Sequence, residues 1–178
     1  MIAIMSGDAL REARGRMNAV REEIYRAVGG KSDDELLAPP SDGGWSAAEV
    51  LDHLRRAEGG LVRCLEAQKR GEPLKIPRRA YWYRIPMSIV FSPIRLRAPK
   101  PVRPRPRAEV SPQEVIAKLK ESRAALLAFA DRVGEEEFRK TLLPHFILGR
   151  FHGLDWFRFI AGHEKRHLGQ IRRVLAGG

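Results

Sequence analysis

The sequence predicts an all-α fold, a four-helix bundle with a long crossover between its second and third helices. Four segments repeat apolar residues at alternating spacings of three and four, the period of one face of a helix. Glycines follow each of these segments, as they commonly do at helix C-termini. No segment alternates apolar and polar residues strongly enough to predict a sheet.

The first predicted helix spans about residues 8–28 and ends at a Gly pair, 29–30. Its apolar face consists of Leu10, Ala13, Met17, Val20, Ile24 and Ala27. The second opens at Ser46, which can cap free amides while Glu49 reaches back, and it ends at Gly71. Its predicted face consists of Val50, Leu54, Ala57, Leu61, Cys64 and Gln68.

The third predicted helix begins at Ser111, with Pro112 at its first position and Glu114 at its third, and it ends before Gly134. Its apolar face consists of Val115, Leu119, Leu126 and Phe129. The fourth spans about residues 154–175. Its apolar stripe consists of Trp156, Phe157, Ile160, Leu168, Ile171 and Val174.

An insertion at about 72–110 separates the second and third helices and shows no clear period. Its part at 99–107 is rich in Pro and Arg and favours the polyproline II conformation. Two parallel helices need a long connection of this kind, because the chain must return along the bundle. We expect the insertion to be mostly irregular and to pack over one flank of the bundle through Trp82, Ile85, Ile89 and Phe91.

Positive charge is concentrated in this insertion. The chain holds 33 basic and 22 acidic residues, a formal charge of +11, and +8 of it lies between Glu72 and Val110. Such a segment can meet nucleic acid, an anionic membrane surface or an acidic substrate, or it can be a solvated, Pro-stiffened loop. The loop is the simpler interpretation, and without a nucleic-acid motif we do not expect nucleic acid as the partner.

Length and composition predict one domain, residues 1–178, with an ordinary buried core. The single cysteine, Cys64, excludes a disulfide within the chain and a cysteine-built metal site, and it fits the reducing cytoplasm. No segment approaches the roughly 18 apolar residues of a membrane span. The apolar start, Met1 to Met5, is too short for a signal peptide.

Two of the five histidines, His163 and His167, are four residues apart and so share one helix face. With Glu164 they spell H-E-x-x-H, the zinc-protease pattern. The 11 residues after His167 contain no His, Asp, Glu or Cys, so a third ligand must come from upstream. His145 and His152 are the remaining histidines of that half of the chain, and we assign them no metal role.

His53 is the predicted third ligand, because it flanks the apolar stripe of the second helix as the pair flanks that of the fourth. A lone His there would usually be a hydrogen-bonded core residue. Inward imidazoles need partners, since burying unpaired polar groups is costly, and a shared divalent ion provides them. We therefore predict that His53, His163 and His167 bind one metal ion.

Glu164 falls inside the apolar stripe, unlike the neighbouring charges. It is the candidate catalytic residue, as an acid or base, but it could also orient a ligand imidazole or belong to a buried pair. We favour the structural role. Cys64 lies about 16 Å along the helix from His53, too far to share an ion, so it is expected in the core.

Two segments resemble a known family. Residues 45–54, WSAAEVLDHL, with Glu58 after them, resemble the second helix of the DinB/YfiT-like superfamily, and residues 162–171, GHEKRHLGQI, resemble its last helix. The resemblance implies an up-down-down-up bundle, often a homodimer, with a Zn or Ni ion on three His that correspond to His53, His163 and His167. It also implies thiol-dependent transferases and isomerases as relatives, in which the metal activates a low-molecular-weight thiol.

The favoured hypothesis is therefore a metal-dependent enzyme, of thiol-dependent transferase or hydrolase type, that acts on a small molecule. Three His leave a position on the ion open for water, thiol or substrate, and the ion lowers the pKa of what binds there. The alternative is a non-catalytic, metal-stabilised protein that binds nucleic acid or an acidic partner through the insertion. Tyr81, Trp82 and Tyr83 could then supply stacking beside the cations.

Overall fold

The computed structural model describes residues 2–88 and 99–177, with the backbone alone for residues 2–7. Within these ranges the chain is all-helical and has isolated β-bridges but no strand, which confirms the predicted class. The four long helices are α1 (Ile2–Val28), α3 (Ala47–Lys69), α5 (Pro112–Val133) and α7 (Gly153–Leu175). The short elements are α2 (Asp33–Leu37), α6 (Glu135–Lys140) and the 3₁₀ turns η1 (Arg78–Tyr81), η2 (Lys100–Val102) and η3 (Arg107–Glu109).

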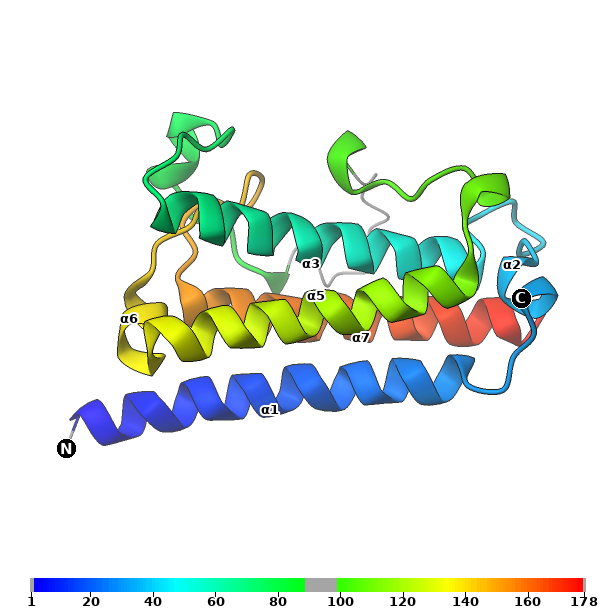
Figure 1. Ribbon diagram of the computed structural model, residues 1–178, viewed down its shortest axis with the longest axis horizontal. Helices are drawn as coiled ribbons and strands as arrows, with labels where there is room; N and C mark the ends of the chain where they lie inside the picture. The colour runs from blue at the N-terminus through cyan, green and yellow to red at the C-terminus, as the bar shows by residue number, and fades with distance from the viewer. Residues whose placement is uncertain (1, 89–98, 178) are drawn as a thin grey trace.

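The four long helices lie side by side along the long axis of the molecule (Figure 1). Helix α1 packs against α7, and α3 packs against both α5 and α7. In Figure 1, α1 and α7 run from left to right, whereas α3 and α5 run from right to left. The described helices include none that is both long and apolar enough to cross a membrane.

Helix starts are set by local capping. The Ser46 hydroxyl accepts the Glu49 N–H at 3.2 Å, and the Glu49 carboxylate accepts the Ser46 N–H at 2.9 Å, so the predicted capping box is formed. The same exchange between Ser32 and Glu35 begins α2, a short helix that the apolar period did not predict. A capping box in the sequence can therefore indicate a helix of less than two turns, which is too short to show an apolar period.

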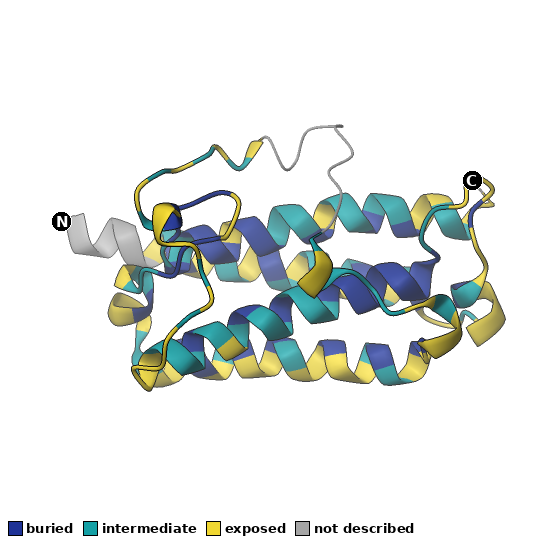
Figure 2. Ribbon diagram, turned by 90° about the horizontal axis from the view of Figure 1, so that it is seen from above, coloured by how far each residue is buried: buried dark blue, intermediate teal, exposed yellow. Residues whose placement is uncertain are grey.

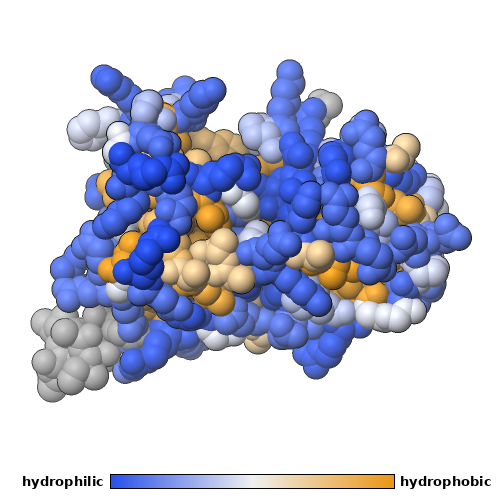
Figure 3. All heavy atoms as spheres, in the orientation of Figure 1, coloured by the Kyte–Doolittle hydropathy of each residue, from blue (hydrophilic) through white to orange (hydrophobic). Residues whose placement is uncertain are grey.

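The core runs the length of the bundle between the long helices (Figure 2). One half is rich in aromatic side chains, and the other, toward α2, is mainly aliphatic. Polar side chains cover most of the face seen in Figure 3, with apolar side chains visible between them. Most positions of the predicted apolar faces are buried; those only half-buried are Val20, Ala27, Ala57, Cys64, Gln68 and Val174.

The insertion contacts a loop at residues 142–152. The Ile85 N–H donates to the Leu148 carbonyl at 2.8 Å, and the Arg150 N–H donates to the Tyr83 carbonyl at 2.7 Å. Ile85 packs against the core as predicted, and Ile89 and Phe91 lie outside the described residues.

The prediction for Trp82 was wrong, because this side chain is 85% exposed. The η1 turn buries Ala80 instead, and the indole that follows the turn is directed outward.

Replacing Gly149 should test the contact between insertion and loop. Gly149 has φ +82° and its added Cβ would lie 2.0 Å from the Tyr83 carbonyl oxygen, so Gly149→Ala must displace the insertion. Gly71→Ala is the matched control, with φ +71° and open space, and should cost only the ~1–2 kcal/mol of a left-handed alanine. Urea unfolding should show a clearly larger loss for Gly149→Ala; equal losses would contradict the close approach.

Candidate metal centre

The three predicted ligands come together where α3 packs against α7. His53 lies in the second turn of α3, and His163 and His167 lie one turn apart on α7. Their ligand atoms all lie within 4.8 Å of one another. Nε2 of His163 is 3.2 Å from Nε2 of His53 and 3.2 Å from Nε2 of His167. His145 and His152 are not part of this group.

Hydrogen bonds on the far side of two rings assign their tautomers. Nδ1 of His53 lies 2.6 Å from the carbonyl oxygen of Val102, and Nδ1 of His167 lies 3.0 Å from Oε1 of Gln170. Both partners are acceptors, so each Nδ1 carries the proton and each Nε2 keeps its lone pair. These lone pairs belong to the nitrogens that converge on His163.

A divalent cation fits this donor set. Burial lowers the pKa of all three imidazoles, that of His167 to about 3, so they are held in the neutral form that binds metals. Only His163 has an N–H left to donate within the cluster, and it can form a hydrogen bond to one of the other two rings at a time. Zn–N bonds of about 2.0–2.1 Å in a tetrahedral site place nitrogens roughly 3.3 Å apart, close to the spacing found here. The three His could therefore hold a metal ion.

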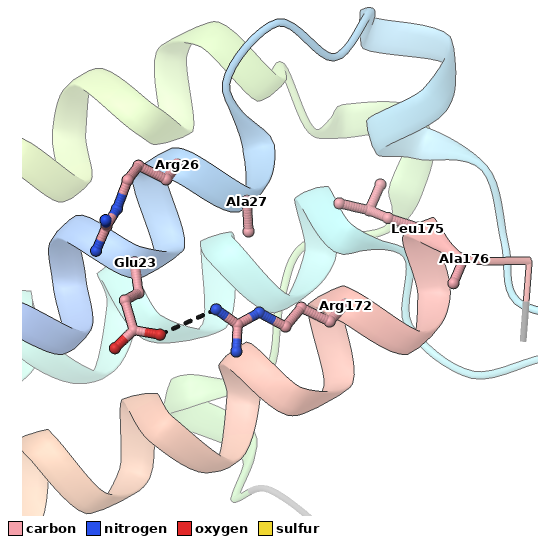
Figure 4. A pocket seen from close by; sticks show the side chains of 6 residues that line it. All are labelled: Glu23, Arg26, Ala27, Arg172, Leu175 and Ala176. Atoms are coloured by element: carbon pink, nitrogen blue, oxygen red, sulfur yellow. Dashed lines mark hydrogen bonds and ion pairs between the residues drawn. The ribbon is translucent and has the colours of Figure 1, made fainter.

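Aromatic rings flank the cluster. The ring of Phe159 stacks on His163 with a centroid distance of 5.3 Å, and Trp45 lies 5.2 Å from the ring of His53. A hollow of about 500 Å³ lies elsewhere, between the ends of α1 and α7 (Figure 4). The ion pair between Glu23 and Arg172 spans it, and none of the three His lines it, so it is not the approach to this site.

Glu164 points away from the histidines into a buried ion network. Its Oε1 accepts hydrogen bonds from Arg21 and, at 2.7 Å, from Arg123. The same two arginines bind Glu58, with Arg123 Nε at 2.7 Å and Arg21 Nη2 at 3.2 Å. None of the four side chains is more than 8% exposed. Each comes from a different long helix, so the network links the whole bundle.

The electrostatics of the network suit a structural pair. Burial raises the pKa of Glu164, and the charges of Arg21 and Arg123 act against that rise. Burial opposes the charge of Arg21, but the carboxylates of Glu164 and Glu58 more than offset it and leave the arginine pKa raised. Arg21 and Arg123 could not be identified from local sequence, because only the facing carboxylates distinguish them from other arginines.

His145 is buried among aromatic rings. Its Nδ1 accepts the N–H groups of Ile147 and Leu148, both at 3.1 Å, which fixes the loop that contacts the insertion. The rings of Phe151, Trp156 and Phe159 surround it, and burial lowers its pKa to about 4. His152 caps the start of α7, where its N–H donates to Asp155.

Comparison with known proteins agrees with this arrangement. A sequence profile of the DinB superfamily matches residues 9–171. The chain belongs to the DinB superfamily. This superfamily is known to bind metals. The chain is similar to the uncharacterised protein YuaE of Bacillus subtilis (strain 168), with 29% identity over 158 residues, 88% of this chain and 93% of that protein. No solved structure matches the chain.

Glu164→Gln should separate pairing from chemistry in this DinB-superfamily protein. The change leaves Arg21 and Arg123 short of a buried counter-charge, so we expect a loss of about 3–5 kcal/mol in the free energy of unfolding. Metal content of the folded protein should stay unchanged, since the carboxylate does not contact the histidines. Exposed Glu12→Gln, which disrupts a surface pair with Arg16, is the control and should stay near wild type. Lost metal with unchanged stability would contradict the pairing role.

His145 should make stability depend on pH. Folded His145 stays neutral to about pH 4, whereas an unfolded His takes up a proton near pH 6.5. The unfolded state therefore binds more protons in this window, and stability should fall with falling pH by about 1.4 kcal/mol per unit. His145→Asn keeps an acceptor near Nδ1 but cannot ionise, so its chelator-treated form should show a shallower fall in urea unfolding from pH 6 to 4.5. Identical slopes would contradict the buried neutral ring.

Proposed function

We propose that His53, His163 and His167 bind one divalent metal ion and that this ion serves a reaction on a small molecule. The observation that carries the proposal is the convergence of three imidazole nitrogens, together with the hydrogen bonds that occupy the far nitrogen of two of these rings, His53 and His167. Imidazole ligands suit Zn or Ni. The reaction type that we propose is a thiol-dependent transfer or a hydrolysis.

The protein's own part in this chemistry is to hold neutral imidazoles in place. Val102 and Gln170 keep two Nδ1 protons turned outward, and Phe159 covers one face of His163. Three protein ligands leave a position for another group, as in catalytic rather than closed structural sites. An ion held there supplies Lewis acidity, which lowers the pKa of a bound water or thiol.

We also propose the up-down-down-up four-helix bundle as the arrangement of this single domain, residues 1–178, with the insertion at 72–110. The helix directions in Figure 1 support it. For Glu164 we propose the pairing role, and its contacts with Arg21 and Arg123 support this over a catalytic one. A homodimer, a low-molecular-weight thiol as cofactor and a cytoplasmic location stay predictions.

A second candidate function is a metal-stabilised binding protein without chemistry of its own. The observation in its favour is that the exposed ring of Trp82 follows, in the same short segment, two exposed arginines, Arg78 and Arg79. Cations beside an accessible indole could hold nucleic acid or an acidic partner. This candidate shares the three-His site with the enzyme, but its ion only stabilises the fold and its insertion binds the partner.

Metal analysis of the purified protein tests the common part of both candidates. We expect close to one divalent ion per chain, because the three His form a single donor set. His163→Ala and His167→Ala should remove most of the metal, and His53→Ala should be nearly as harmful. His152→Ala is the control and should keep the wild-type content. Full metal content in His53→Ala would reduce the site to the pair on α7.

Activity separates the two candidates once metal is established. The metal-loaded protein is screened with and without cellular thiols, and the metal-free His163→Ala protein serves as the blank. Turnover that disappears in the blank supports the enzyme. Metal-loaded protein without turnover, but with salt-sensitive binding of nucleic acid, would favour the second candidate.

A further inference from the structure

The end of the insertion forms part of the candidate metal centre. Residues 99–107, called the strap below, cross the first turns of α3 and are held there by four contacts within 3.3 Å. These contacts join Arg56 to the Pro101 carbonyl, His53 to the Val102 carbonyl, Asp52 to the Arg105 N–H, and Glu49 to the Arg107 side chain.

The sequence of the strap leaves the Val102 carbonyl available to His53. The η2 turn closes with Val102 N–H on the Pro99 carbonyl at 3.1 Å and then ends. Pro104 and Pro106 have no N–H, so neither can donate to Val102 from within the strap. The N–H between them, that of Arg105, is turned to Asp52 instead.

Asp52 is the residue that ties the strap to the helix. Its carboxylate is 0% exposed. Oδ1 accepts from Arg55 at 2.8 and 3.0 Å, and Oδ2 accepts from the Arg105 N–H at 2.9 Å. A buried carboxylate oxygen without a hydrogen-bond partner is costly, so release of the strap, which would leave Oδ2 without its partner or expose it to water, is unfavourable. Asp52 directly precedes His53 in α3. These two neighbours therefore bind both ends of residues 102–105, His53 at the Val102 carbonyl and Asp52 at the Arg105 N–H.

We propose that Asp52 is a positioning residue of the metal centre. By fixing the Arg105 N–H it seats the strap, and the seated Val102 carbonyl holds His53 with its proton on Nδ1 and its Nε2 lone pair toward His163. Metal binding and strap docking then stabilise each other to the same extent, as linked equilibria must. This inference rests on the proposed three-His site and assigns the insertion a part in it.

A pair of variants at Arg105 isolates the hydrogen bond. Arg105→Pro removes the N–H that Asp52 accepts, and the flanking prolines already favour an extended backbone there. Arg105→Ala removes the same side chain and keeps the N–H. Zn²⁺ affinity is measured by competition with a chromophoric chelator. We expect Arg105→Pro to bind Zn²⁺ about 10- to 100-fold more weakly than Arg105→Ala, the loss typical of disturbed support for a ligand. Equal affinities would overturn the proposal.

Asp52→Asn tests whether the Asp52 carboxylate supports Zn²⁺ binding, and Asp155→Asn is the matched control. Asp155 also accepts an arginine, Arg84 at 2.7 Å, and a backbone N–H, that of His152 at 3.0 Å, but it does not touch the strap. Both substitutions should lower stability. Only Asp52→Asn should weaken Zn²⁺ binding, and a similar weakening in Asp155→Asn would reduce the effect to general destabilisation.

The tautomer of His53 gives a readout that needs no metal. Nitrogen NMR of the chelator-treated wild type should show the proton of His53 on Nδ1, and Arg105→Pro should lose this preference while Arg105→Ala keeps it. If wild-type protein bound no Zn²⁺, the proposed function would be wrong. The His53 tautomer in the two Arg105 variants would still show whether Asp52 positions His53. If Zn²⁺ bound normally and the tautomer were the same in both Arg105 variants, the positioning role would be wrong and the metal site would stand.

Discussion

The buried ion network is the contact on which the rest of the bundle depends. Arg21, Glu58, Arg123 and Glu164 bring one charge from each long helix into the interior, where every charge needs its partners to be tolerated. The network therefore fixes the depth and the rotation of α7. Because Glu164 faces the arginines, its neighbour His163 is turned toward α3 and His53.

Local patterns predicted much of this structure. The helix period predicts the long helices, Ser46 and Ser111 mark the starts of two of them, and the four-residue spacing of His163 and His167 puts both rings on one face. The approach of His53 to this pair could be predicted because apolar stripes must face each other. Contacts that depend on tertiary packing could not, including the Val102 carbonyl beside His53. The outward position of Trp82 was missed for the same reason, since hydrophobicity alone does not say which side of a turn faces the core.

Backbone hydrogen bonds hold the described part of the insertion in two regions, with different consequences. Its first part joins the loop at 142–152, where Gly149 allows the backbone of Tyr83 to come close. Its last part lies on α3 and reaches His53. The basic side chains thus belong to a segment whose backbone is hydrogen-bonded to the bundle. Charge, which dominates the composition of the insertion, does not explain either attachment by itself.

The three tryptophans occupy three different environments. Trp156 is buried and donates its indole N–H to the Leu143 carbonyl at 2.7 Å, and Trp82 is open to solvent. Trp45 lies against the ring of His53, with 5.2 Å between centroids. An indole so close to a candidate ligand senses a change of charge on that imidazole through its excited state. The protein therefore carries a built-in optical reporter at its histidine cluster, with a solvent-exposed and a buried indole as internal references.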